Sequence, residues 1–138
     1  MTNQMRKKTV IESKSDFIRP AGRRFRILSL GNRECRIRSL TAGEMRSFRS
    51  SLSNAKGELI RKRADRLQEL LIAQCLATAT GDRILADEDV VAGDFDLLDG
   101  GEIATLFAAC KDHTGFGADA DWTAIEDAAK NSGPTSTN

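Results

Sequence analysis

A cysteine and the only histidine of the chain stand three residues apart, at Cys110 and His113. On a helix this spacing places two side chains on one face, where they could share a metal ion or form a nucleophilic couple. A zinc site needs a second Cys or His pair, and the remaining cysteines, Cys35 and Cys75, fall on expected apolar faces. No glycine-rich oxyanion turn or third orienting group accompanies the couple. We therefore expect no metal, no cofactor and no enzymatic activity.

The acidic stretch 94–100 has the composition of a calcium-binding loop. Such a loop needs an oxygen ligand at position 5, a glycine at position 6 and a glutamate at position 12. Counted from Asp94, these positions hold Leu98, Asp99 and Thr105. The aspartates are therefore interpreted as helix caps. The glycine-rich segments likewise lack the lysine of a phosphate-binding loop and the spacing of a dinucleotide motif.

Arginines alternate along two segments, 24–30 and 33–40, that flank Gly31-Asn32 and have the pattern of a β-hairpin. A two-residue loop would mix apolar and basic residues on both faces, whereas a three-residue loop would separate them. We therefore expect a three-residue loop or a bulge. One face would then be apolar and would carry Phe25, Ile27, Cys35 and Ile37. The other would be basic and would carry Arg24, Arg26, Arg36 and Arg38.

A basic face of this kind could lie along nucleic-acid phosphates. Three observations argue against nucleic acid as a partner. The aromatic residue of the hairpin, Phe25, faces the core, Glu34 lies on the arginine face, and the following helix alternates its charges. We expect a solvated face or one paired with acidic residues. A small nucleic-acid-binding regulatory protein that uses this face is the alternative function.

The only tryptophan, Trp122, stands near Ile125 in an acidic segment. Two interpretations are equally supported. The helix that carries Trp122 either covers the core of its own domain or is presented to the groove of a partner, with Trp122 as the anchor. Together with the four hairpin arginines, Trp122 and Ile125 form the candidate interaction surface.

Cap and turn signals predict the elements that position these residues. Thr41 and Glu44 form a capping box that opens a helix over 42–52, with Met45, Phe48 and Leu52 facing inward. A long helix is expected from Glu58 to about Ala77, with ion pairs Glu58–Lys62 and Arg66–Glu69. The later elements are a small hairpin closed by Thr80-Gly81-Asp82, helical turns at 87–92 and 94–98, a helix from Asp99 to about His113, and a last helix capped by Asp121.

The chain has 138 residues, enough for one domain and its tails. No apolar run approaches the ~18 residues of a membrane span, and no signal peptide is expected. Three scattered cysteines indicate a reducing compartment. The predicted fold is α+β, a mostly α-helical single domain with a small amino-terminal antiparallel hairpin. The expected segments are a flexible basic arm over 1–15, the domain over 16–117, a short helix over 118–130 and a disordered tail over 131–138.

The net charge of +1 conceals two oppositely charged halves. Residues 1–76 hold 18 Lys and Arg against 7 Asp and Glu, a net charge of +11, and residues 77–138 hold 3 against 13, a net charge of −10. Three explanations are open: the halves attract each other within one fold, neighbouring subunits do so, or the basic half binds nucleic acid.

Several short phrases carry a resemblance to a known family. They are Ile37–Glu44 (IRSLTAGE), Leu71–Leu76 (LIAQCL), Thr80–Leu85 (TGDRIL), Leu106-Phe107, Gly115–Gly117 (GFG) and Ile125–Ser132 (IEDAAKNS). In this order the chain resembles the tail assembly chaperones of long-tailed bacteriophages over residues 24–132.

The resemblance implies a non-enzymatic protein that binds and solubilises the tape measure protein and helps recruit tail tube subunits during tail assembly. It also implies action in the cytoplasm of the infected host cell and absence from the mature virion. The family has no motif-defined functional residues, so none is carried over. Because heterologous contacts between complementary halves give rings or open arrays, we also expect self-association.

Overall fold

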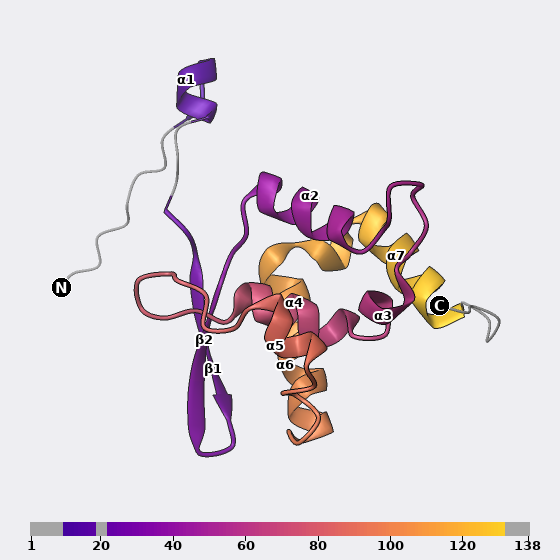
Figure 1. Cartoon of the computed structure of the whole chain (residues 1–138). Coiled ribbons are helices and arrows are strands. Elements are labelled where there is room, and N and C mark those ends of the chain that lie inside the picture. Colours follow the sequence, from indigo (N-terminus) through magenta and orange to yellow (C-terminus); the bar gives the residue numbers. More distant parts are fainter. Residues whose placement is uncertain (1–9, 19–21, 132–138) are drawn as a thin grey trace.

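The computed structural model describes residues 10–18 and 22–131 of the chain. It shows the predicted α+β fold, a two-stranded antiparallel hairpin beside a mostly helical body (Figure 1). The elements are α1 (Lys14–Phe17), β1 (Phe25–Leu30), β2 (Arg33–Arg38), α2 (Ala42–Ser51), α3 (Arg61–Ala64), α4 (Leu67–Cys75), α5 (Asp87–Val91), α6 (Gly100–Thr114), the 3₁₀ turn η1 (Phe116–Ala118) and α7 (Ala120–Asn131).

The two ends of the chain can be compared with the expected arm and tail only in part. Residues 1–9 of the arm and 132–138 of the tail lie outside the described residues. Residues 14–17 form a helical turn, α1, which crosses the expected boundary between arm and domain after residue 15. At the other end α7 includes Asn131, the first residue of the expected tail.

The register of the hairpin differs from the prediction. Leu30 pairs with Arg33 across a two-residue loop, so Ile27 lies opposite Arg36 and Phe25 opposite Arg38. Gly31, the first loop residue, has φ +64°, a conformation that glycine adopts without strain and that a tight hairpin turn requires. The turn geometry therefore sets the register, and the predicted three-residue loop is wrong.

This register produces an apolar face that the prediction did not contain. Leu28 and Leu30, which were not assigned to the core face, lie beside Cys35 and Ile37 and pack against the helical core. Phe25 and Ile27, which were expected in the core, point to the other face and are exposed. One face of the hairpin is still apolar and packs against the core, but β1 contributes Leu28 and Leu30 to it in place of Phe25 and Ile27.

The predicted capping box at the start of α2 is confirmed. The Thr41 hydroxyl accepts a hydrogen bond from the Glu44 backbone N–H, and the Glu44 carboxylate accepts one from the Thr41 N–H. The inward positions are confirmed as well, because Phe48 and Leu52 are buried and Met45 packs against the core.

Glu44 also links α2 to Arg23, which lies just before β1. The Arg23 guanidinium donates two hydrogen bonds of 2.7 Å to its carboxylate. These bonds, together with the backbone N–H of Thr41, lower the pKa of Glu44 to about 2. The ionised form of the Glu44 side chain is therefore more stable in the folded protein than in the unfolded chain.

A Glu44→Gln variant tests this linkage. Because the folded pKa is depressed below the ordinary value of 4.5, the carboxylate stabilises the fold above that pH, and this stabilisation is lost as the pH falls toward about 2. We expect the variant to be less stable than the original protein at pH 7, with the gap narrowing by pH 2.5. Urea unfolding at both pH values measures it. A gap of equal size at both would contradict the linkage.

The long helix predicted over 58–77 is wrong as a single element. The chain leaves helical geometry at Arg66 (φ −112°, ψ 25°), which separates α3 from α4, and Leu59 forms a strand-like bridge with Ser53. The predicted ion pairs are replaced by Arg61–Asp65 at 3.1 Å and Arg66–Asp96 at 2.7 Å.

The burial of α4 also differs from the prediction. The prediction assumed one apolar stripe, whereas α4 is buried on nearly all sides. Its buried residues are Leu67, Leu70, Leu71, Ile72, Ala73 and Cys75. A helix that is apolar all round lies in the middle of a domain, and α4 packs against both α5 and α6.

The remaining caps agree with the predictions except at the last helix. The Asp99 carboxylate accepts from the backbone N–H of Glu102 and opens α6, and the turn at Gly81 brings Ala77 and Arg83 together as a bridge. At α7 the capping carboxylate is that of Asp119, which accepts from the Trp122 N–H at 3.0 Å. The predicted cap, Asp121, is wrong by two positions.

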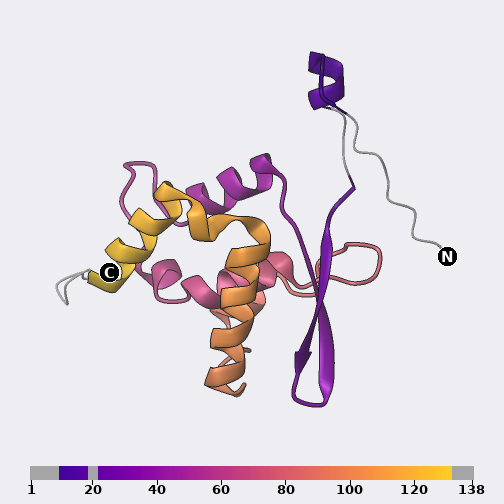
Figure 2. The same ribbon diagram turned by 180° about the vertical axis from the view of Figure 1, so that it is seen from behind.

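Four aromatic rings close the core where α2, α6, η1 and α7 meet. Figure 2 shows α6 and α7 on the near side of the molecule. The Trp122 ring lies 4.6 Å from Phe116, 5.7 Å from Phe48 and 6.4 Å from Phe107, measured between centroids. The 12-residue helix α7 is held on the body by this cluster, with Ile125 and Ala129 packed beside it.

Much of the charge asymmetry is neutralised within the fold. In the described part of the chain, five ion pairs join a base of the first half to an acid of the second. They are Arg26–Asp112, Arg33–Glu102, Arg49–Asp119, Arg63–Asp87 and Arg66–Asp96. Partly exposed pairs of this kind contribute little stability each, but they show that the halves of one chain are complementary.

Candidate protein interface

The four hairpin arginines do not share a face. Arg24 and Arg26 lie on the α6 side, where the Arg24 guanidinium donates to the His113 carbonyl at 2.7 Å and Arg26 pairs with Asp112 at 3.3 Å. Arg36 and Arg38 lie on the opposite side, because the two-residue loop shifts their register. The predicted continuous arginine face is therefore wrong.

Arg38 has a structural role. Its residue is 6% exposed, and its guanidinium donates to the backbone carbonyls of Gln74 at 2.8 Å and Gly81 at 3.3 Å. Burial lowers the pKa of this guanidinium, although arginine stays charged at physiological pH. The side chain ties β2 to the end of α4 and to the turn that follows it.

For Trp122, the sequence left two interpretations open: the side chain either covers the core of its own domain or anchors a partner. The side chain has no exposed surface, and its ring lies in the aromatic cluster, so it covers its own core. Ile125 is half-buried against the same core. Neither residue forms an exposed anchor, and the candidate surface predicted around them is not assembled.

Cys110 and His113 are both committed to the fold. His113 Nε2 lies 3.0 Å from the Arg24 carbonyl, to which it donates, so these two residues exchange hydrogen bonds and fasten the hairpin to α6. Cys110 is buried, and the adjacent Cys75 thiol and burial both raise its pKa. Within the described ranges, no three side chains of His, Cys, Asp or Glu gather as metal ligands.

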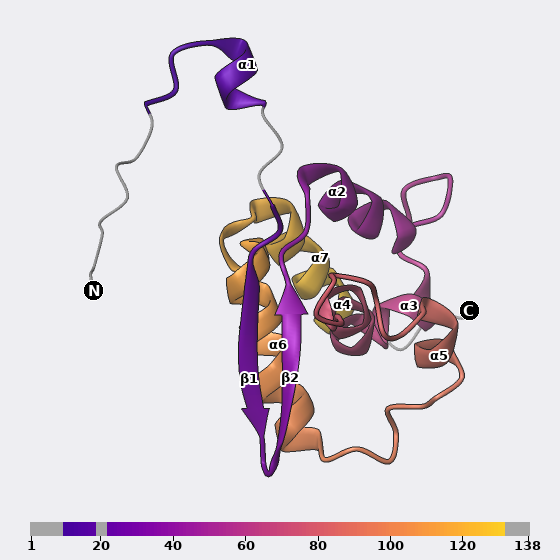
Figure 3. The same cartoon turned by 90° about the vertical axis from the view of Figure 1, so that its left-hand side faces the viewer.

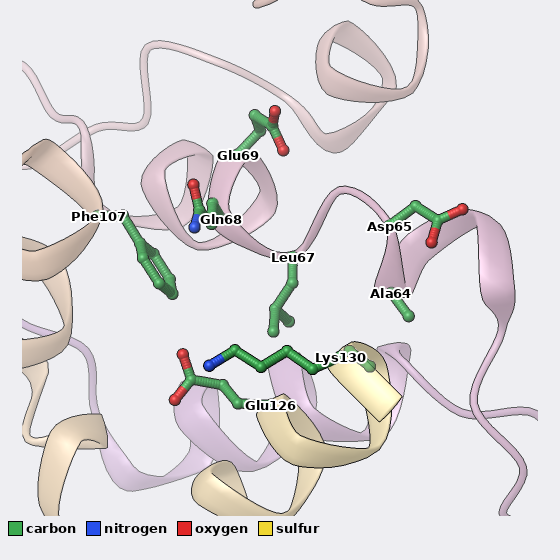
Figure 4. A pocket seen from close by; sticks show the side chains of 9 residues that line it. Ala64, Asp65, Leu67, Gln68, Glu69, Phe107, Glu126 and Lys130 are labelled. Atoms are coloured by element: carbon green, nitrogen blue, oxygen red, sulfur yellow. The ribbon is translucent and has the colours of Figure 1, made fainter. Parts of the chain in front are cut away.

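A polar groove of about 320 Å³ lies between the α3–α4 segment, α6 and α7. In Figure 4 the side chains of Leu67, Phe107, Glu126 and Lys130 face the same space. Lys111 holds the Glu126 carboxylate at 3.2 Å and lies over the Phe107 ring at 4.9 Å. Charged residues line much of this groove, and two of them, Asp65 and Glu126, are paired with Arg61 and Lys111 of their own chain.

A second groove, of about 270 Å³, is apolar and is lined by segments far apart in the sequence. We call it the hairpin groove. The hairpin supplies Leu30 and Cys35, the segment after α4 supplies Leu76, Ile84 and Leu85, the turn after α5 supplies Phe95 and Leu98, and α6 supplies Ile103 and Leu106. Figure 3 shows the hairpin lying along α6, with the connection from α5 to α6 to the right of the hairpin.

The floor and the edge of the hairpin groove differ in exposure. Phe95 and Leu106 are buried, and Leu30, Leu85 and Ile103 are half-buried. At the edge Ile84 and Leu98 are 56% and 44% exposed. Large exposed apolar side chains that border an apolar groove are typical of a binding surface.

The rim of the hairpin groove is acidic. Glu34, Asp94 and Glu102 line it, against one base, Arg33, whose guanidinium lies 3.6 Å from the Glu102 carboxylate. The excess of carboxylates favours a partner segment that carries basic residues beside apolar ones.

No family model, curated protein or solved structure matches this chain. In the described residues, no helix is long and apolar enough to cross a membrane. The function is therefore inferred from the hairpin groove and from the resemblance in the sequence.

Sequence reasoning missed the hairpin groove altogether. Its edge residues, Ile84 and Leu98, lie in short segments between turns. Such segments are too short to show the hydrophobic periodicity from which a buried or binding face is predicted. The one available signal was Leu97-Leu98 within an acidic stretch, which had been interpreted as part of a helical turn.

Proposed function

We propose that this chain is a non-enzymatic assembly chaperone of a phage tail, which binds and solubilises the tape measure protein and helps recruit tail tube subunits. The observation that carries the proposal is the hairpin groove, with its apolar floor, exposed apolar edge and acidic rim. The resemblance to tail assembly chaperones supplies the class of client. Its place of action is the cytoplasm of the infected host cell, and it is left out of the mature virion.

The groove suits one segment of a long helical client. An amphipathic helix binds such a groove by side chains at positions i, i+3 or i+4 and i+7, which would contact the leucine and isoleucine side chains of the edge and floor. Basic residues beside that stripe would face the acidic rim. Many copies, each making one moderate contact, can cover a long client with high total affinity.

Two adjacent leucines provide a matched test. Leu98 lines the hairpin groove, whereas Leu97 is 96% exposed and does not line it. We expect Leu98→Glu to weaken client binding by about tenfold or more, because it removes apolar contact and adds a charge beside an acidic rim. Leu97→Glu should leave binding unchanged. The readout is the soluble fraction of the tape measure protein when it is co-expressed with each variant.

Circular dichroism and urea unfolding of the purified variants establish that both are folded. If the original chain does not keep the tape measure protein soluble, the proposed function is wrong. If it does and both leucine variants act alike, a surface other than the hairpin groove binds the client.

A further inference from the structure

The segment that precedes the hairpin carries uncovered apolar side chains. Val10, Ile11, Phe17 and Ile18 are each more than half exposed, with Phe17 at 71%. Within residues 10–18, which the structure describes, the helical structure is the single turn α1, which Ser13 caps by accepting from the Asp16 N–H at 3.1 Å. Figure 1 shows α1 apart from the body of the molecule.

The same segment has the pattern of a longer amphipathic helix. At 100° per residue, the four apolar side chains fall within an arc of about 120°, with Lys14 inside that arc. Glu12 and Asp16 fall on the opposite side. An isolated helix of nine residues is marginal in water, so a helix over 10–18 needs a surface against which its apolar stripe can pack.

The hairpin groove offers apolar contacts and an acidic rim to this stripe. Its edge offers the exposed side chains of Ile84 and Leu98 to an apolar helix face. Lys14 lies in the middle of the stripe, and its long side chain can extend past the apolar floor to the rim carboxylates of Glu34, Asp94 and Glu102. The bases that flank the segment in the sequence, at 6–8 and at 19, add to the attraction.

We propose that residues 10–18 of one copy form an amphipathic helix in the hairpin groove of a second copy. A second copy is favoured over the same chain because α1 lies apart from the body (Figure 1) and the four apolar side chains of residues 10–18 are each more than half exposed, so the segment does not fill the groove of its own chain.

The resulting contact is head to tail. Each copy uses its amino-terminal segment on one neighbour and its hairpin groove on the other. A heterologous contact of this kind forms either closed rings or open arrays that lengthen with protein concentration. The inference shares the hairpin groove with the proposed function but does not need the client, so the two are tested by different measurements.

The test uses the full chain and sedimentation velocity over a range of protein concentrations. We expect the original chain to form oligomers, and the double substitution Phe17→Ser and Ile18→Ser to raise the dissociation constant about tenfold or more. Leu98→Glu should have the same effect from the other side of the contact. Ile27→Ser, which changes an exposed apolar residue outside both surfaces, is the matched control and should associate normally.

Mixing the two defective variants decides between a second copy and the same chain. The variant altered at residues 17 and 18 keeps an intact groove, and the Leu98→Glu variant keeps an intact segment. We expect their mixture to form a one-to-one dimer that neither forms alone. A mixture that stays monomeric, or an original chain that stays monomeric at high concentration, overturns the inference.

Two further outcomes are informative. If Leu98→Glu fails to fold, Ile84→Glu takes its place, and the variant altered at residues 17 and 18 still tests the contact because its exposed side chains lie outside the core. If the original chain solubilises the tape measure protein but never self-associates, the inference fails while the proposed function stands. If the original chain self-associates but does not solubilise the tape measure protein, the inference stands and the proposed function is wrong.

Discussion

Replacing Trp122 by alanine should lower the free energy of unfolding by about 3–5 kcal/mol. The side chain has no exposed surface and contacts three phenylalanine rings, so its removal leaves a large cavity between α2, α6 and α7. A domain of this size is stable by only about 5–15 kcal/mol, so the variant should keep a small part of its stability. Urea unfolding followed by circular dichroism measures the change.

Trp122→Phe is the matched control. The indole Nε1 is buried without a hydrogen-bond partner, so phenylalanine removes no hydrogen bond while keeping an aromatic ring in the cluster. We expect a much smaller loss than for alanine. If Trp122→Ala kept full stability and instead abolished binding to another polypeptide, the tryptophan would be a partner anchor and the core assignment would fail.

Replacing Arg38 by glutamine should destabilise the fold by about 1–3 kcal/mol. Glutamine is too short to reach both the Gln74 and the Gly81 carbonyls, so at least one buried acceptor would lose its donor. Arg36→Gln is the control, because it removes one positive charge from the same face of the hairpin without touching these two carbonyls. Urea unfolding at neutral pH compares the two variants.

The same pair of variants addresses the nucleic-acid alternative. If the hairpin bound phosphates, Arg36→Gln would weaken oligonucleotide binding and reduce its salt dependence. We expect no such change, because the arginines are divided between two faces and three of them contact groups of their own chain. Tight oligonucleotide binding that Arg36→Gln weakens would contradict this expectation.

Local signals predicted much of the fold. The capping box at Thr41 and Glu44 and the cap at Asp99 are both formed as expected, because each depends on hydrogen bonds within four residues of the chain. The turn at Gly31-Asn32 was also recognised. The predicted loop length was wrong. A three-residue loop was expected because it separates apolar from basic residues, whereas Gly31 allows the tighter two-residue turn.

Other features depended on partners distant in the sequence. The break at Arg66 accompanies a pairing with Asp96, thirty positions away, and α4 is surrounded on nearly all sides by elements that no periodicity reveals. The hairpin groove is the extreme case, because four separate segments meet to form it. Single apolar residues such as Ile84 and Leu98 acquire a common role only when those segments are side by side.

The amino-acid order by itself determined the fold class, most of the helix starts and the complementary charges of the two halves. These follow from hydrogen bonds between near neighbours and from composition. Tertiary structure alone decided which face of the hairpin is buried, that Trp122 and Arg38 are internal, and where the apolar groove lies. The physical reason is that burial depends on which surfaces come together, and a shift of one residue in a strand exchanges its faces.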